Sequence, residues 1–493
     1  MGGAQASLLT QVVQLVADAA ASYRGTAYEH VLGDIMGRLH EPLRVAVAGK
    51  IKAGKSTLVN ALVGDELAPT DEGECTRVVT WYRHGLTYRV TLKPNDGASR
   101  QVPFTRDGGA IEVQLGGMAP EDVESLHVEW PVPALRQLTI IDTPGIGSLS
   151  VDASARSLDF LVPEDEQTTP SDAVIYLLRH LHKSDVAFLH SFHEAEYAQP
   201  SPVNCVAVLS RADEVAVGRL DALESAAAIA ARYRADPRLR RLVQHVVPVA
   251  GLLAQAGSNL QEMEYRRLSL LASSPSEAAE LLMSADRFAT AASSIAVGQP
   301  ERRALLDRLG LFGVRLSVDL LQRGLAPSAT ELANLLVSRS GIGELREILL
   351  SQFAERRDTL KARSALLAIQ RLLAQTSNFQ HADLSSRTEQ LWSGAHEFVE
   401  LRALNALRRG EVDVRANEAA EIERLLGFRG AGLHARLGLA DDAPFDDVHR
   451  HLLDALDRWR QRAENPGSSL PVKTMARVVV RSCEGLYLQT TPQ

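Results

Sequence analysis

Cysteine is scarce in this sequence. Its 493 residues include three cysteines, Cys75, Cys205 and Cys483, which lie far apart and form no CxxC pair. An odd number of widely spaced cysteines provides neither a disulfide framework nor a zinc site. We therefore expect a protein of a reducing compartment, namely the cytoplasm.

Long apolar runs and an excess of positive charge are missing as well. No stretch of eighteen consecutive apolar residues occurs, so the sequence predicts no membrane-spanning helix. Any contact with the inner face of the plasma membrane would then be peripheral. The formal net charge of −8 and the aromatic content of 5% argue against a nucleic-acid-binding protein that works through bulk charge. The first residues show no charged segment before an apolar core, so we expect no signal peptide.

Two kinds of periodicity are abundant. Residues 6–39 place apolar side chains at helical spacing, and residues 43–250 contain short apolar, β-branched runs that alternate with helical stretches. The second pattern predicts a mostly parallel sheet with crossover helices, and extra antiparallel strands in residues 81–130. After residue 252 almost every segment is typical of helix. Residues 344–374 predict one helix roughly 45 Å long, so we expect an elongated helical bundle.

The segment VAVAGKIKAGKSTLVNALVG has the spacing of a phosphate-binding loop: Gly49, four residues, then Gly54, Lys55 and Ser56. The loop follows an apolar strand and opens a helix, the setting in which backbone N–H groups and a helix N-terminus hold phosphates. We expect Lys55 to reach the β- and γ-phosphates and Ser56 to ligate magnesium. The residues expected to bind nucleotide here are Gly49, Lys50, Ala53, Gly54, Lys55, Ser56 and Thr57.

A second motif, LTIIDTPG, ends an apolar strand in Asp142. We expect Asp142 to act on magnesium through water and the Gly145 amide to sense the γ-phosphate. In DEGECTRVVTW, Thr76 is the candidate threonine that closes on magnesium when the γ-phosphate is present. Thr70 and Thr80 compete with Thr76 for that role.

The segment VNCVAVLSRADE indicates which base is bound. Its apolar strand is followed by Ser210, Arg211 and Asp213, at the position of an Asn/Thr-Lys-x-Asp element. A carboxylate at Asp213 accepts from guanine N1–H and the 2-amino group, whereas adenine offers neither donor. In VVPVAG, Ala250 and the following glycine are expected near the base. The motifs occur in the order typical of GTPases and predict a GTP- and GDP-binding domain that uses Mg²⁺.

The loop carries two further lysines, Lys50 and Lys52. Many small GTPases place a glutamine directly after the glycine of the DxxG motif to orient water, but here that residue is Ile146. We expect Lys52 to supply a cation near the β–γ bridge when two GTPase domains pair. The alternative is that both lysines point outward and only attract nucleotide.

The segments KAGKSTLVNALVGDELAPTDEGECTRVVTW, VEWPVPALRQLTIIDTPG and SRADE resemble the bacterial dynamin-like proteins, and within them the isoniazid-inducible actinobacterial members. The likeness continues through SGIGELREILLSQFAERRDTLKA and covers nearly the whole chain. It implies a GTPase head on an antiparallel helical neck and trunk, in which nucleotide-driven pairing of heads remodels membranes. It also implies that residues 1–40 form neck helices, that residues 41–343 form the head with a helical insertion at 252–340, and that residues 344–493 form neck and trunk.

The sequence departs from the wider dynamin pattern at two places. Lys52 stands where dynamins typically have a serine that helps a monovalent cation, which suggests catalysis independent of potassium. The base element is altered to Ser-Arg-Ala-Asp, which suggests weak binding of guanine.

Two functions are open at this stage. One is a GTPase that couples pairing of its heads, as a homodimer, to remodelling of an anionic membrane, with a sibling dynamin-like protein as a second partner. The other is a GTP-binding scaffold or partner subunit with weak turnover and no lipid binding of its own. The loops that could meet a membrane are 375–385, with Phe379, and 427–438, with Phe428 and Leu433.

Overall fold

The computed structural model describes residues 7–69, 78–107, 110–145, 171–194, 204–354, 356–376 and 382–490. Within them a nine-stranded sheet forms the centre of the molecule, in the order β11-β10-β9-β1-β8-β2-β7-β3-β4. The strands of this sheet are β1 (Leu43–Gly49), β2 (Val79–His84), β3 (Arg89–Pro94), β4 (Arg100–Gln101), β7 (Val123–Trp130), β8 (Leu138–Asp142), β9 (Ala173–Leu178), β10 (Cys205–Ser210) and β11 (His245–Val249). A separate hairpin pairs β5 (Phe104–Asp107) with β6 (Ala110–Val113).

The sheet confirms the predicted mixture of strand directions. From β11 to β8 all neighbours are parallel. Strand β2 is antiparallel to β8, and β3 is antiparallel to both β7 and β4, which gives the antiparallel addition expected in residues 81–130. Because side chains alternate along a strand, β1 sends Val45 and Val47 to the face that α3 (Lys55–Val63) covers and Ala46 to the other face.

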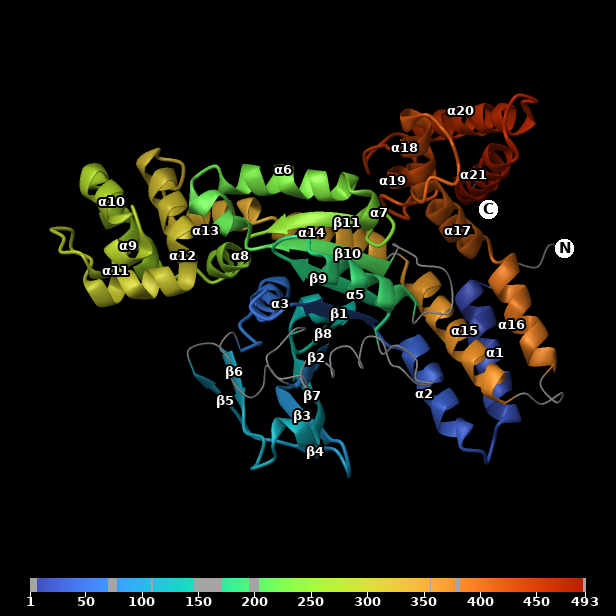
Figure 1. Cartoon of the computed structure of the whole chain (residues 1–493), viewed down its shortest axis with the longest axis horizontal. Coiled ribbons are helices and arrows are strands. Elements are labelled where there is room, and N and C mark those ends of the chain that lie inside the picture. The colour runs from blue at the N-terminus through green and yellow to red at the C-terminus, as the bar shows by residue number, and fades with distance from the viewer. Residues whose placement is uncertain are drawn as a thin grey trace.

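Helices cover the sheet and extend from it on two sides. Three helices connect the parallel strands: α5 (Lys183–Glu194), α6 (Ala222–Ala235) and α7 (Pro237–Arg240). Helix α14 (Ile342–Ile348) comes later in the chain, after the last strand, β11, and a group of further helices. Between β11 and α14 lie the helices that we call the insertion, which form one end of the molecule (Figure 1). They are α8 (Gly251–Ser258), α9 (Glu262–Ala272), α10 (Pro275–Leu281), α11 (Ala285–Thr290), α12 (Gln299–Gln322) and α13 (Ala329–Arg339).

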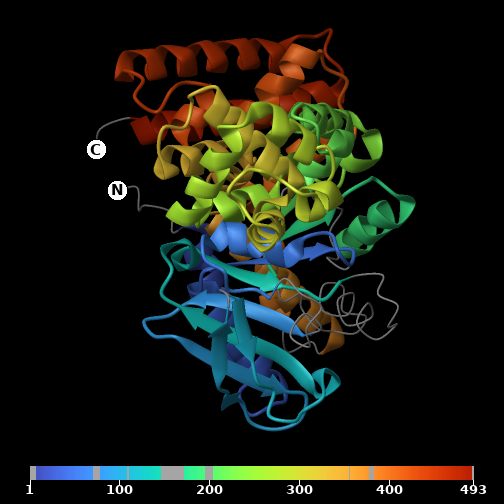
Figure 2. The ribbon, with the colours of Figure 1, turned by 90° about the vertical axis from the view of Figure 1, so that its left-hand side faces the viewer.

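The remaining helices form two bundles on the other side of the sheet (Figure 1). The neck shares one apolar core and consists of α1 (Leu8–Ser22), α2 (Tyr28–His40), α15 (Arg357–Gln375) and α16 (Ala382–Gly394). The trunk has its own core and consists of α17 (His396–Arg408), α18 (Ala416–Leu425), α19 (Leu433–Leu437), α20 (Phe445–Glu464) and α21 (Leu470–Thr490). Figure 2 shows the trunk and the strands β3 and β4 at opposite ends of the molecule.

The single helix predicted over 344–374 is wrong. The chain forms α14, then a π-helical turn at Leu349–Ala354, and then α15. Leu349 and Phe353 are buried in the core beneath the sheet, whereas Leu366 is buried in the neck core. The change of helix type therefore lies where the chain passes from one core to the other, and the predicted elongated bundle is divided into two shorter ones.

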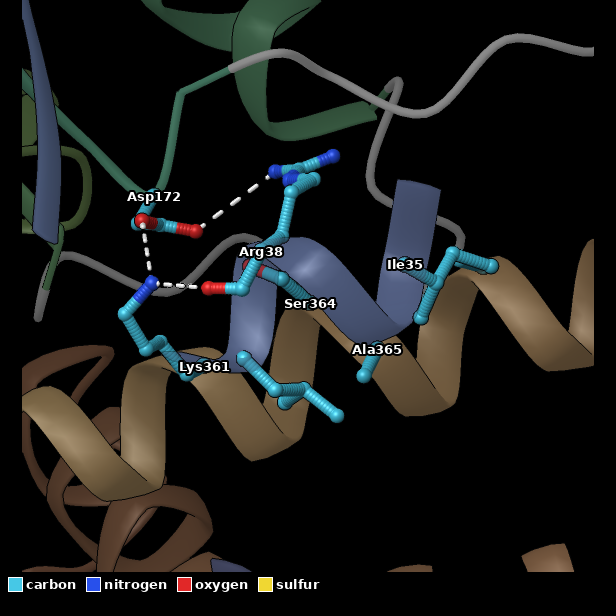
Figure 3. Close-up of a pocket in the computed structure, with 8 residues that line it drawn as sticks. Ile35, Arg38, Asp172, Lys361, Ser364 and Ala365 are labelled. Carbon is cyan, nitrogen blue, oxygen red and sulfur yellow. Dashed lines mark hydrogen bonds and ion pairs between the residues drawn. The ribbon is translucent and has the colours of Figure 1, made fainter. Parts of the chain in front are cut away.

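The neck meets the sheet at Asp172, directly before β9. The Asp172 carboxylate accepts from the Arg44 N–H at 2.9 Å and lies 3.5 Å from Arg38 Nη2 and 3.8 Å from Lys361 Nζ. Figure 3 shows Arg38 of α2 and Lys361 of α15 pointing toward this carboxylate, with Lys361 also donating to the Arg38 carbonyl. Burial lowers the pKa of Lys361 to about 8. This ion pair ties both neck helices to the start of a central strand.

The trunk packs on the edge strand of the sheet through the loop 427–438. Phe428 is 4% exposed and stacks on His245 of β11, with ring centroids 5.6 Å apart. The Gln244 side chain donates to the Phe428 carbonyl at 3.0 Å, and the Arg408 guanidinium lies 4.3 Å from the Phe428 ring centroid. Of the two loops named as candidates for membrane contact, 427–438 therefore has its phenylalanine buried, because the Phe428 ring lies in the trunk core and against β11.

The other candidate tip, 375–385, includes Phe379, which lies outside the described residues. No described helix combines the length and the apolar character needed to cross a bilayer.

Candidate nucleotide site

The phosphate loop follows β1 and is shaped by two glycines. Gly49 has φ +152°, and a Cβ there would lie 2.7 Å from the Leu177 carbonyl oxygen of the neighbouring strand, so only glycine fits. Gly54 has φ +91° and caps α3 in the left-handed region that favours glycine. The first helical residues, Lys55 and Ser56, thereby project their amides and side chains at the loop.

Lys55 folds back into the loop. Its Nζ donates to the carbonyls of Gly49 and Lys50, each at 3.4 Å. Burial lowers the pKa of Lys55, and the charge of Asp142 opposes that shift. These are long hydrogen bonds, so the ammonium is placed to exchange them for phosphate oxygens.

Ser56 and Asp142 meet as the sequence predicts. The Ser56 hydroxyl donates to Asp142 Oδ2 at 3.1 Å. Asp142 Oδ1 is buried and has no hydrogen-bond partner within the part of the chain that the structure describes. Burial raises the pKa of Asp142 to about 6, against the charge of Lys55. A hydroxyl and a buried carboxylate with a spare oxygen fit a hydrated Mg²⁺ ion, which prefers oxygen ligands and keeps several waters.

The DxxG segment crosses directly over the phosphate loop. A Cβ on Gly145 would lie 2.9 Å from the Ile51 Cα, a separation that real Cβ atoms do not adopt. Glycine is therefore required at this crossing, and its backbone lies beside the loop residues that precede Lys55.

A cleft of about 240 Å³, partly open to solvent, joins the phosphate loop to the base element. Its walls come from α3 and its loop, from the ends of β9, β10 and β11, and from α8. The lining residues are Ala53, Gly54, Thr57, Leu58, Leu177, Val208, Ser210, Arg211, Asp213, Glu214, Val249, Gly251 and Leu252. Segments separated by some 200 residues in the sequence thus form one elongated site, with phosphate-binding features at one end and Asp213 at the other.

The base end of the cleft is built around Asp213, which is 7% exposed and whose pKa is raised by burial. Arg211 adopts a left-handed backbone with φ +53° and pairs with Glu214 at 2.6 Å. The Ser210 hydroxyl donates to the Leu178 carbonyl at 3.3 Å, so it is engaged with the neighbouring strand. Ala250 is fully buried and is not among the lining residues; the following Gly251 and Leu252 form the wall in its place.

The insertion contributes to this end of the site. Helix α12 is broken at Gly310 (φ +65°), where a Cβ would lie 3.7 Å from Leu252 Cδ1 and 4.0 Å from Asp213 Oδ2. Further along α12, Arg315 donates to the Gly218 carbonyl at 2.7 Å, at the end of the turn that carries Asp213. The burial of Asp213 therefore depends partly on the insertion, which sequence patterns did not indicate.

The two extra lysines of the loop differ in their surroundings. Lys50 Nζ lies 3.1 Å from Asp185 Oδ1 in α5, so its side chain points to a buried carboxylate and not into the cleft. Lys52 is exposed and has a left-handed backbone with φ +60°. Asp185 and its hydrogen-bonding neighbour Tyr176 were missed by the motif analysis, because neither belongs to a GTPase motif.

Thr76, Thr70 and Ile146 lie outside the described residues. Thr80, the remaining alternative for the switch threonine, is in β2 opposite Asp142 and is 7% exposed. Its hydroxyl donates to the Val78 carbonyl at 3.2 Å, as in an ordinary buried strand residue.

Comparison with known proteins shows the family of this chain. Residues 45–191 match the model of the dynamin family. The chain is 40% identical over 480 residues to the isoniazid-induced protein IniC of Mycobacterium tuberculosis, covering 95% of this chain and 96% of that protein. It is 32% identical over 141 residues to IniA of the same species, covering 27% of this chain and 22% of IniA. A bacterial dynamin-like protein of Nostoc punctiforme is 36% identical over 125 residues, 23% of this chain and 18% of that protein.

The chain belongs to the dynamin family. The similarity to IniC over nearly its full length confirms the resemblance to the isoniazid-inducible bacterial members.

Proposed function

We propose that this protein binds GTP with Mg²⁺ and hydrolyses it to GDP and phosphate. The observation that carries the proposal is the continuous cleft from the phosphate loop to the buried Asp213 carboxylate. A buried carboxylate that accepts two hydrogen bonds from guanine penalises a base without those donors, because its own desolvation is then uncompensated.

Each residue of the site has its own role in binding the phosphates and the metal. Lys55 leaves the carbonyls of Gly49 and Lys50 and binds the β- and γ-phosphate oxygens, while the loop amides hold the β-phosphate. Ser56, Asp142 and Thr76 would hold the metal. A bound Mg²⁺ neutralises the charge of the β- and γ-phosphates. The Gly145 amide contacts the γ-phosphate beside the loop.

Lys52 takes the catalytic role in this proposal. Since Ile146 cannot orient water, the positive charge needed at the β–γ bridge comes from Lys52, ordered when two heads pair. An exposed residue on the loop suits this role because a partner head can reach it. The alternative is that Lys52 only attracts nucleotide.

We further propose that pairing of heads as a homodimer is coupled to remodelling of an anionic membrane at the inner face of the plasma membrane, with a sibling dynamin-like protein as a second partner. The chain is similar to both IniC and IniA, so two related proteins of this kind occur in one species, Mycobacterium tuberculosis. This supports a sibling dynamin-like protein as the second partner. The alternative, a GTP-binding partner subunit with weak turnover and no lipid binding of its own, is the other outcome of the test.

The test is GTP turnover by the full chain as a function of protein concentration, with and without anionic liposomes. Lys55→Ala provides the blank, because the loop then lacks its phosphate-binding ammonium. Specific activity that rises with concentration and again with liposomes is the expected result. Turnover that stays flat, together with no sedimentation with liposomes, would leave the partner-subunit function in its place. Turnover equal to that of Lys55→Ala would contradict the GTPase proposal itself.

A further inference from the structure

A fully buried carboxylate lies beside the phosphate loop and outside every motif of the nucleotide site. Asp185, in the first turn of α5, has a side chain that is 2% exposed. Its Oδ1 accepts from the Tyr176 hydroxyl at 2.9 Å, and its Oδ2 accepts from the His182 N–H at 2.8 Å. Lys50 Nζ lies 3.1 Å from Oδ1 and 3.3 Å from Oδ2, so the ammonium binds both oxygens.

Lys50 connects this carboxylate to the phosphate-binding ammonium. Its side chain is held by Asp185, while its own carbonyl accepts from Lys55 Nζ at 3.4 Å. Lys50 directly follows Gly49, where the close approach to Leu177 allows no side chain. The first turn of the loop is thus fixed at Gly49 by the backbone of β9 and at Lys50 by α5.

The contacts of Asp185 with Lys50 and Tyr176, which we call the anchor, extend into the sheet. Tyr176 lies on β9 directly beside Ala48 of β1, the residue before Gly49, and its ring stacks on Phe188 of α5. The Tyr176 hydroxyl therefore reaches the Asp185 carboxylate from β9, and the Lys50 ammonium reaches it from the loop that directly follows β1.

The physical reason for the anchor follows from what a phosphate loop must do. Its amides have to converge on one anion, so the side chain of residue 50 has to leave the loop on the outer side. The Lys50 side chain is 40% exposed, so water screens the ion pair and its net contribution to stability is small. What a fixed pair does provide is a defined position for the loop backbone, and it compensates the buried charge of Asp185.

We propose that Asp185 is a positioning residue for phosphate binding, which acts through Lys50 to hold the start of the loop in the shape that receives the β-phosphate. This inference rests on the proposed GTPase function and adds to it a residue that no motif contains. Asp185 does not touch nucleotide. Its effect is therefore on the affinity for the phosphates and not on the choice of base.

The experiment measures the dissociation constant of Mg·GDP by calorimetry on the full chain. We expect Asp185→Asn and Lys50→Met each to weaken GDP binding roughly tenfold, the effect of losing one charge-assisted hydrogen bond. The double variant is expected to bind no more weakly than either single variant, because both remove the same anchor. Lys50→Arg keeps the charge and is expected to retain most of the affinity.

Two further measurements separate positioning from a general loss of stability. The ratio of GTP to ITP affinity is expected to stay as in the wild type, because ITP differs only by the 2-amino group at the other end of the cleft. Glu400→Gln removes a buried carboxylate from a comparable ion pair with Arg436 in the trunk. This matched control is expected to lower the melting temperature but to leave GDP binding unchanged.

Several results would overturn the inference: unchanged affinity in Asp185→Asn, tighter binding in that variant, additive losses in the double variant, or an altered GTP-to-ITP ratio. If Asp185→Asn does not fold, Tyr176→Phe, which keeps both charges and nearly the same volume, is expected to weaken GDP binding about threefold, and unchanged binding there would overturn the inference equally. A wild type that fails to bind GDP would instead contradict the proposed function, so the two failures are distinguishable.

Discussion

At the scale of single residues, the three lysines of the phosphate loop have three different environments. Lys55 bonds to the loop carbonyls, Lys50 to the buried Asp185, and Lys52 is exposed on a left-handed backbone. A short loop rich in positive charge therefore does not present all of that charge to one phosphate group. Of the three lysines, Lys52 is the one with a proposed catalytic role, as the cation at the β–γ bridge.

We predict that Lys52→Ala lowers kcat for GTP about 100-fold, the size of effect seen when one preorganised group at a developing charge is removed. The KM is expected to change little, because Lys55 and the loop amides still bind the ground-state phosphates. Single-turnover and steady-state hydrolysis measure both quantities, and light scattering checks that the heads still pair. Normal kcat with normal pairing would show that Lys52 does not take part in the chemistry.

The residues that sequence patterns predicted are those whose type is dictated by backbone geometry or by the ligand. Gly49 and Gly145 are required by contacts too close for a Cβ, and Ser56 and Asp142 meet because the ends of adjacent parallel strands share one edge. Asp185 could not be predicted in the same way. Its role depends on how α5 packs on β9, and that is decided by tertiary contacts and not by spacing in the chain.

At the scale of elements, the contact between the trunk and the edge strand β11 is the least expected feature. Phe428 lies in one of the two loops that the sequence offered as candidates for membrane contact, but its ring is covered by His245 and Arg408. Burial lowers the pKa of His245 to about 4, so the imidazole is neutral where it stacks on the ring. The loop thereby joins two separate cores.

We predict that Phe428→Ala destabilises the protein by about 3–5 kcal/mol, the usual effect of deleting a buried aromatic ring. Phe445→Ala in α20 is the matched control, because that ring is 56% exposed and its loss is expected to change stability by less than about 0.5 kcal/mol. Urea unfolding followed by circular dichroism measures both. Equal stabilities of the two variants would show that the Phe428 ring is not buried in solution.

The sequence predicted which segments are helical, but it did not predict where one helix ends and the next begins. The sequence shows helical periodicity throughout 344–374, because the π-helical turn is short and Leu349 and Phe353, four residues apart, still face the same core. The break at Leu349–Ala354 arises because Leu349 and Phe353 pack in one core and the residues of α15 in another. Periodicity reports which face is apolar, but it does not report which core that face joins.

At the scale of the whole molecule, the nucleotide cleft lies at the ends of strands β9, β10 and β11. The sheet that contains these strands carries helical bodies on two sides (Figure 1). The insertion reaches the base end through Gly310 and Arg315, and the neck reaches β9 through Asp172. The insertion and the neck therefore each contact an element that also lines the cleft. In the proposed function this cleft binds guanine through Asp213.

The proposed role of Asp213 is tested by the affinity of the full chain for GDP, ADP and XDP, in the wild type and in Asp213→Asn. We predict that the wild type prefers GDP to ADP by at least about 100-fold. Asp213→Asn is expected to lose GDP and to gain XDP, because an amide can donate to the C2 carbonyl of xanthine where the carboxylate could only accept. Equal affinities of the wild type for GDP and ADP, or an unchanged preference in Asp213→Asn, would contradict the account.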